Sequence, residues 1–351
     1  MAQIDKDEAP GWHAIDAACE RLYPGQKEVH VAAVPPPGLG GSSVLNGVSV
    51  YQGAGDTPHW HYVTYGLTEL FGKESSDPDE SGFGFELTFR LRRGEETEPP
   101  KWPFEMLQGL GRYVFNTGNV FEPGHYRQRL APIVQEIETQ IFSLIFIADP
   151  DLPDLDTPNG KVRFVQAVGI TSDEMDAVWN VGVDMIESLL ARRSTKRVTD
   201  IARTSILADP VVLGAVEDRA RQDGSPTEVI YGDRVEAERD GSTTTLIFSA
   251  TTMRSLLAVL PYRWPFGREL SLYHPECVVV WGKGDANAVR NHGIHTHVTL
   301  DDRGYRELLA TLRPVAGNYA VPSLPGLSLQ VEATEIRNAE GKVVYRIGAA
   351  G

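Results

Sequence analysis

Two histidines separated by a single residue, His59 and His61, are the first candidates for chemistry in this sequence. They lie in the stretch TPHWHYVTYG at 57–66. On a β-strand the two side chains share a face and stand roughly 6.5–7 Å apart, a spacing that can bracket one metal ion. If the strand continues, Glu69 shares that face. Because a catalytic metal needs three protein ligands and an open position, a metal-dependent enzyme that uses His59, His61 and Glu69 is one hypothesis.

A second pair with the same spacing, His295 and His297 in NHGIHTHVTL, makes the metal hypothesis more attractive. The surrounding motifs count against it. Cupin-type sites carry a metal-binding glutamate three or four residues after the histidine pair, where this chain has Tyr65 and Gly66. No H-E-x-x-H motif occurs either. We therefore expect histidines that belong to aromatic strands, predict no cofactor, and keep the metal site as the alternative.

Motifs for nucleophilic catalysis and nucleotide binding are also missing. The sequence has no G-x-S-x-G, no P-loop, and no G-x-G-x-x-G that opens a helix after a strand. The carboxylates of Asp149, Asp151, Asp154 and Asp156 lie in a proline-broken loop, where we expect a solvated acidic connection. The residues therefore offer no catalytic set, and we predict that the chain is not an enzyme.

The composition indicates a folded acidic protein. Its 351 residues are 41% hydrophobic, and 33 basic against 48 acidic residues give a net charge of -15, which opposes nucleic-acid binding. No apolar run approaches the roughly 20 residues that cross a membrane. The N-terminus MAQIDKDEAPGW lacks the pattern of a secretory signal, so we expect a cytoplasmic protein. Cys19 and Cys277 lie far apart and are expected to be buried thiols.

The periodicity of the apolar residues predicts two α+β domains. The clearest strand is 81–92, where GFGFELTFRLR alternates strictly and indicates one buried face, one wetter face and a mostly antiparallel sheet. Helices are expected at 99–117 and 171–193, and a DG turn at 240–241 predicts a hairpin. We expect domains at 1–225 and 226–351, each with a mixed or mostly antiparallel sheet and packed helices.

Several stretches, in order, resemble the Suppressor of fused family. The similarity covers about 180 residues of the N-terminal part and is faint beyond 226, so the second domain is expected to be divergent. The matching stretches are PGWHAIDAACERLYPGQ (10–26), PHWHYVTYGLTELFG (58–72), SGFGFELTFRLRR (81–93), PPKWPFEMLQGLGRYVFNTGNVF (99–121) and TPNGKVRFVQAVGITSDEMDAVWNVGVDMIESL (157–189).

The resemblance implies a two-domain binding scaffold without catalysis. In animals, such proteins hold zinc-finger transcription factors of the Hedgehog pathway and take a short extended peptide between the two domains. Capture of this kind is strand addition, in which main-chain hydrogen bonds give affinity and side-chain pockets give choice. The family's peptide-contacting tyrosine and phenylalanine match Tyr113 and Phe121, so the resemblance places the partner site at Tyr113, Phe121 and His125.

The same site departs from the family pattern at one position. The family's acidic contact follows a glycine just after the phenylalanine, but here Gly124 is followed by His125, which puts the animal ligand in doubt. The charged insertion of the animal members is absent, so the chain looks like a bacterial-type member. Such members are thought to serve as immunity proteins, and an acidic protein fits a basic toxin as its partner.

Overall fold

The computed structural model describes residues 9–32, 43–54, 57–128, 131–134, 137–337 and 342–349. Contacts between Cα atoms divide the chain into two compact units. The first comprises Met1–Ser172 and Val183–Ile206, and the second comprises Asp173–Gly182 and Leu207–Gly351. The domain boundary was expected between residues 225 and 226. In this division the helix just before it, Pro210–Asp223, belongs to the second unit.

One mixed sheet forms the centre of the first unit, with the strand order β1-β2-β3-β4-β8-β6-β5 and with β7 paired to β8. All neighbouring strands are antiparallel except β4 and β8. The strands are β1 (Val29–Ala32), β2 (Gly47–Gly53), β3 (His59–Tyr65), β4 (Glu80–Arg92), β5 (Tyr126–Arg127), β6 (Ile141–Ala148), β7 (Leu155–Thr157) and β8 (Gly160–Thr171), and the helices are α1 (Pro10–Leu22), α2 (Trp102–Thr117) and α4 (Val183–Ala191).

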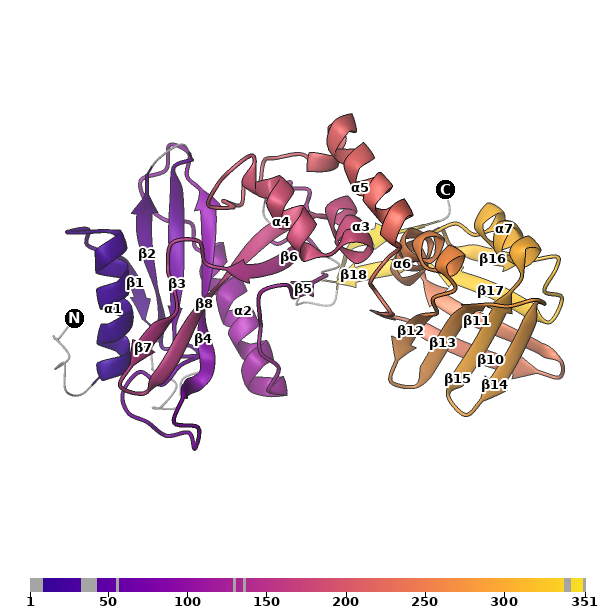
Figure 1. Ribbon diagram of the computed structural model, residues 1–351, viewed down its shortest axis with the longest axis horizontal. Helices are drawn as coiled ribbons and strands as arrows, with labels where there is room; N and C mark the ends of the chain where they lie inside the picture. Colours follow the sequence, from indigo (N-terminus) through magenta and orange to yellow (C-terminus); the bar gives the residue numbers. More distant parts are fainter. Residues whose placement is uncertain are drawn as a thin grey trace. The chain divides into compact units, whose positions relative to one another are not determined.

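Helices α1 and α2 cover opposite faces of this sheet (Figure 1). Alternation along β3 sends Trp60 and Tyr62 into the cluster under α2, which includes Leu107. Val63 and Tyr65 point the other way, into the cluster around α1. Trp60 and Tyr62 therefore pack on one side of the strand, and the face that His59 and His61 share lies on the other.

The expectation that one face of β4 is in contact with water is wrong. Glu86, Thr88 and Arg90 are all fully buried, because layers of the fold cover both faces of the sheet. Each of these polar groups has partners. Glu86 accepts hydrogen bonds from the hydroxyls of Thr64 and Thr68, each at 2.6 Å. Burial raises the pKa of Glu86, although these hydrogen bonds act in the opposite direction.

The second unit contains a four-stranded sheet in the order β10-β11-β17-β16, a five-stranded sheet in the order β14-β15-β13-β12-β9, and the pair β18-β19. Its strands are β9 (Val229–Tyr231), β10 (Val235–Asp240), β11 (Thr243–Ser249), β12 (Leu270–His274), β13 (Cys277–Lys283), β14 (Ala288–His292), β15 (His295–Leu300), β16 (Gly317–Ala320), β17 (Leu327–Glu332), β18 (Thr334–Arg337) and β19 (Val343–Ile347). Its helices are α3 (Ser172–Val181), α5 (Pro210–Asp223), α6 (Ala250–Val259) and α7 (Asp302–Thr311), with short 3-10 turns at Ile206–Ala208, Leu260–Tyr262 and Trp264–Phe266.

The α+β class with two domains is confirmed, and two elements differ in detail. The helix expected at 171–193 is two helices, α3 and α4, separated at Gly182, whose φ of 84° is a left-handed conformation that favours glycine. The DG hairpin is present as β10–β11, with Gly241 at φ 58°. Both cysteines are free and buried. Among the described residues, no helix is both long and apolar enough to span a membrane.

Candidate functional site

Two aromatic residues were expected to contact a partner, and they lie side by side: Tyr113 in the C-terminal half of α2 and Phe121 shortly after the helix. Their ring centroids are 5.5 Å apart, and Phe121 stacks in turn on Phe146 of β6 at 4.2 Å. Phe121 is only 6% exposed and belongs to the core under α2, whereas Tyr113 is half-buried at its margin. Of the two rings, Tyr113 is therefore the one that a partner can touch.

His125 lies at the turn between Phe121 and β5. Its side chain is exposed, and its Nδ1 lies 3.3 Å from the backbone nitrogen of Glu122. Its carbonyl accepts a hydrogen bond from the backbone nitrogen of Phe146 at 2.9 Å, and Gly124 donates to the carbonyl of Phe146. The turn thereby fixes the start of β5 against β6. Gly124 adopts φ 93°, which explains a glycine at this position.

Strand β5 is a terminal strand of the sheet over the part of the chain that the structure describes. Tyr126 and Arg127 pair with Ile145 and Leu144 of β6 on one side. A terminal strand presents backbone donors and acceptors on its other side, which a further strand can use. The elements therefore place Tyr113 and His125 beside a sheet edge.

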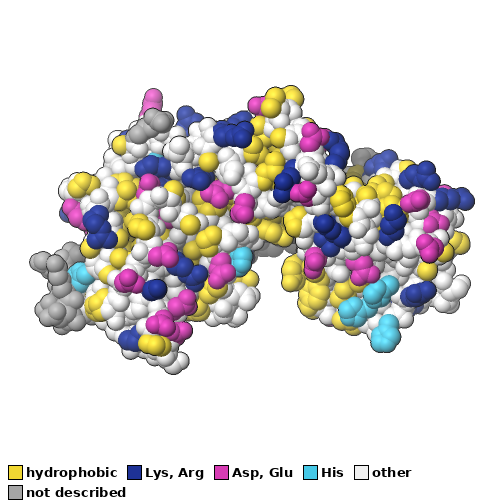
Figure 2. All heavy atoms as spheres, viewed as in Figure 1, with side chains coloured by type: hydrophobic (Ala, Val, Ile, Leu, Met, Phe, Trp, Pro, Cys, Tyr) yellow, Lys and Arg dark blue, Asp and Glu magenta, His cyan; other side chains and the backbone are white. Residues whose placement is uncertain are grey.

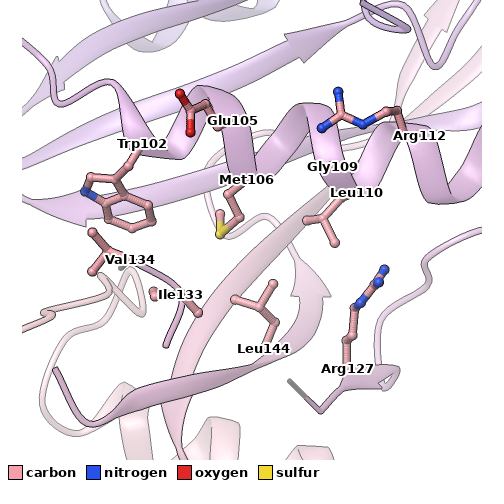
Figure 3. Close-up of a pocket in the computed structure, with 10 residues that line it drawn as sticks. All are labelled: Trp102, Glu105, Met106, Gly109, Leu110, Arg112, Arg127, Ile133, Val134 and Leu144. Atoms are coloured by element: carbon pink, nitrogen blue, oxygen red, sulfur yellow. The ribbon is translucent and has the colours of Figure 1, made fainter. Parts of the chain in front are cut away.

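Arg127 connects this edge to a pocket of about 460 Å³ between α2 and the strands (Figure 3). Its guanidinium lies 4.7 Å from the centre of the Tyr113 ring, a cation–π contact, while the same side chain lines the pocket. Its Nη1 is buried and has no hydrogen-bond partner among the described residues. A buried donor without a partner is costly, so this guanidinium is suited to receive an acceptor from a ligand.

The pocket has an apolar floor and charged ends. Met106, Leu110 and Leu144 project into its middle, with Trp102 at one end (Figure 3). Glu105 and Arg112 also line it, both on the exposed side of α2. The pocket can therefore hold an apolar side chain, with an acidic group at the Arg127 end.

The strand histidines lie inside the protein. His59 and His61 are both fully buried. His61 Nδ1 lies 2.9 Å from the hydroxyl of Tyr23, and its Nε2 lies 3.3 Å from Oδ2 of Asp149. Burial lowers the pKa of His61 to about 4, and the neighbouring Arg90 acts in the same direction. Protein therefore covers the face of β3 that carries His59 and His61.

Glu69, the expected third ligand, belongs to a different group of contacts. β3 ends at Tyr65, so Glu69 lies beyond the strand in the following loop. Its carboxylate accepts hydrogen bonds from Lys73 and from the backbone nitrogens of Glu74 and Ser75. The structure therefore does not bring Glu69 together with the two histidines. Among the described residues, no group of three or more His, Cys, Asp or Glu side chains could hold a metal ion.

The second pair, His295 and His297, lies on the surface of the second unit. Both side chains are exposed, and their ring centroids are 6.3 Å apart. His292, on the neighbouring strand, pairs with His295 in the β14–β15 hairpin. Figure 2 shows histidines gathered over this hairpin. His295 and His297 are therefore surface residues of the second unit.

Two features of the first unit were not predicted from the sequence. Asp149 was expected in a solvated acidic loop, but it is 7% exposed and pairs with Arg90. No residue pattern in the loop indicates that Asp149 is buried, because its partner Arg90 lies on β4, far away in the sequence. Arg127 was also missed. Its only sequence signal is a basic residue shortly after the expected partner position His125, in an acidic chain.

Known proteins resemble this chain in sequence. The model of the family described as Suppressor of fused protein matches residues 41–204. The Suppressor of fused homologs of Homo sapiens and Mus musculus are each 36% identical to it over 233 residues, which cover 61% of this chain and 48% of each relative. The chain thus spans about half the length of the curated relatives that it matches.

Solved structures share the fold. The crystal structure of Drosophila Suppressor of Fused superimposes with a TM-score of 0.67 at 21% identity, covering 93% of this chain and 97% of that one. A chain of the Sufu–Fu complex crystal structure superimposes with a TM-score of 0.56 at 30% identity, covering 60% of this chain and 98% of that one. Shared sequence over nearly all of that second chain, a shared fold and the family match lead to one conclusion: this chain belongs to the Suppressor of fused family.

Proposed function

We propose that the chain is a non-enzymatic protein-binding scaffold that takes an extended segment of a partner at the β5 edge. Tyr113, His125 and Arg127 would make the side-chain contacts. The observation that carries the proposal is Arg127, whose guanidinium lies over the Tyr113 ring and whose buried Nη1 has no hydrogen-bond partner among the described residues. A partner acceptor at this position removes the cost of that buried donor.

The sheet edge and the pocket supply the two parts that strand addition needs. β5 is the last strand in the described order of the sheet, a position where main-chain hydrogen bonds to an added strand can form, and the pocket beside α2 offers a place for one side chain of the added segment. The apolar floor at Met106 and Leu110 suits an aliphatic or aromatic residue. The proposed partner segment is therefore extended, with an apolar residue next to an acidic one.

Family membership supports a protein as the ligand. One similar chain comes from a Sufu–Fu complex, so that relative binds a protein. Because this chain spans about half of its curated relatives, its own partner is part of the proposal. From the resemblance we further propose that the segment is held between the two domains and that the protein is a bacterial-type immunity protein. From the N-terminal sequence we propose that it acts in the cytoplasm.

The net charge of the chain bears on the kind of partner that we propose. A net charge of -15 favours a partner with a basic surface, such as a basic toxin, because complementary charge speeds association. The Arg127 end of the pocket favours a carboxylate at one point of contact. The two statements are compatible, since the first concerns the whole surface and the second concerns one side chain of the partner.

Affinity capture from the native host tests the proposal. The wild-type protein is compared with Arg127→Glu, which reverses the charge at the pocket, and with the control Phe115→Ala. Phe115 is 44% exposed on the same helix as Tyr113 and does not line the pocket. We expect one partner to be lost with Arg127→Glu and kept with Phe115→Ala. Equal recovery of every captured protein by all three would contradict the proposed site.

A further inference from the structure

One glycine of helix α2 lines the pocket of the proposed partner site. Gly109 lies in the interior of the 16-residue helix Trp102–Thr117, and its backbone is helical rather than left-handed. Glycine in a helix interior is less favourable than alanine, because glycine loses more conformational freedom when the chain folds. A glycine at this position therefore needs a reason other than its own backbone conformation.

Close packing explains the neighbouring glycine of the same helix but not Gly109. A methyl group at Gly111 would lie 3.1 Å from two side-chain carbons of Leu45 and 3.2 Å from Val44, which is closer than ordinary contact. Outside the backbone of the helix, a methyl group at Gly109 would meet one described atom within 4 Å. That atom is Nη2 of Arg112, at an ordinary contact distance of 3.9 Å. Alanine therefore fits at residue 109 without moving any described neighbour.

The missing side chain leaves a gap in the wall of the pocket. Residues three or four apart share a face of a helix, so Glu105, Gly109 and Arg112 form the outer row of this wall. The side chains of Glu105 and Arg112 are exposed. Met106 and Leu110 form the inner row, which is buried. Gly109 is therefore a gap between two charged side chains, next to the apolar floor (Figure 3).

We propose that Gly109 determines which side chain the pocket accepts. This inference rests on the proposed function and deepens it: a large apolar side chain of the partner, such as an aromatic ring or leucine, passes over Gly109 to reach Met106 and Leu110. The volume of about 460 Å³ lies within the range of roughly 300–1,000 Å³ that is usual for ligand pockets. A side chain at residue 109 would block this path. The stability that glycine costs the helix is thus exchanged for binding.

Thermal unfolding of the full chain separates this role from packing. Gly109→Ala is expected to raise the unfolding midpoint by about 1–4 °C, because alanine is the better helix former. Gly214 in helix α5 is the matched control, since a methyl group there would meet no described atom within 4 Å outside its own helix. Gly214→Ala should likewise not lower the midpoint. A lower midpoint for Gly109→Ala would show that packing requires this glycine and would overturn the inference.

Binding of the dye anilinonaphthalene sulfonate tests the gap directly. The dye joins apolar rings to an anionic sulfonate, so it matches the apolar floor and the Arg127 end of the pocket. Fluorescence titration compares the wild-type protein with Gly109→Leu, whose side chain fills the gap, and with Gly214→Leu. We expect Gly109→Leu to weaken dye binding by about tenfold or more, as for a poor fit in an apolar pocket. Gly214→Leu should retain wild-type affinity.

The inference is overturned if the dye does not bind the wild-type protein, if Gly109→Leu binds it as tightly as the wild type, or if both leucine variants weaken binding equally. Partner capture keeps this test apart from that of the proposed function. A partner that is lost with Arg127→Glu but kept with Gly109→Leu would leave the partner site in place and contradict the role of Gly109. Weaker dye binding by Gly109→Leu, with no partner lost in Arg127→Glu, would support the gap and contradict the proposed function.

Discussion

Arg90 and Asp149 form a two-point ion pair inside the first unit. Nη1 of Arg90 lies 2.7 Å from Oδ2 of Asp149, and Nη2 lies 2.9 Å from Oδ1. Both side chains are fully buried. Burial raises the pKa of Asp149, but hydrogen bonds and charge from His61 and Arg90 outweigh it and hold this pKa well below its usual value. The pair fixes β4 to the loop after β6.

Removing one partner of this pair should destabilise the first unit strongly. Arg90→Met leaves the Asp149 carboxylate buried without its cation, which costs about 3–5 kcal/mol of unfolding free energy. Arg92→Met is the control, because the Arg92 side chain is 61% exposed and its pair with Asp200 contributes at most about 1 kcal/mol. Urea denaturation of both variants measures the difference. Similar losses for the two variants would show that the buried pair has no special role.

Acid should destabilise the protein through its buried strand histidines. Burial lowers the pKa of His59 and of His61 to about 4, below the value of about 6.5 in an unfolded chain. The unfolded state therefore binds more protons. The contribution of these two histidines to the unfolding free energy is fully present above about pH 6.5 and is lost as the pH falls towards 4. Each histidine adds a slope of at most about 1.4 kcal/mol per pH unit.

Unfolding free energies measured between pH 7 and pH 4.5 test this expectation. His61→Gln keeps a polar group near Tyr23 but cannot titrate, so its slope should be smaller than that of the wild type. His297→Gln, at an exposed position in the second unit, should leave the slope unchanged. A wild-type slope that survives His61→Gln intact would rule out His61 as its source.

Chelators should leave the stability of the protein unchanged. His59 Nδ1 lies 2.8 Å from the carbonyl of Thr57, and both ring nitrogens of His61 have protein neighbours at Tyr23 and Asp149. A structural or catalytic metal at His59 and His61 would contribute binding energy to the folded state, which a chelator would remove. Thermal unfolding with and without EDTA, together with elemental content, decides the matter. A stoichiometric metal together with a thermal unfolding midpoint that EDTA lowers would support the hypothesis of a metal-dependent enzyme.

Phe121 and Tyr113 should respond differently to truncation. Phe121 is buried against Phe146, so Phe121→Ala should cost about 3–5 kcal/mol of stability through the cavity that it leaves. Tyr113 is half-buried at the margin of the core, and Tyr113→Ala should cost less. Urea denaturation of both variants measures this. Equal losses would assign Tyr113 to packing and weaken its assignment to the partner site.

The sequence predicted the elements whose periodicity reflects one buried face. The alternation of 81–92 gave β4, and the apolar stripe of 99–117 gave α2, because local side-chain direction follows from backbone geometry alone. The opposite face of β4 was misjudged. Glu86 and Arg90 are polar and buried, and hydrogen bonds to distant segments offset the free-energy cost of burying them.

The residues proposed for the partner site came from the resemblance, and they stay a prediction. Tyr113 contacts Arg127 of β5, whereas the packing of Phe121 in the core could not be read from its residue type. Arg127 acquires its role from a cation–π contact and a missing hydrogen bond, which depend on tertiary structure. No local pattern encodes either of them.

Hydrogen exchange of the protein alone and in complex with the captured partner tests the central claim most directly. If the partner adds a strand at β5, the backbone amides of 124–128 become protected on binding, and Arg127→Glu abolishes that protection. Amides of α1, on the other face of the sheet, should exchange at the same rate in both states. Protection that is confined to other segments, with 124–128 unchanged in the complex, would contradict the account.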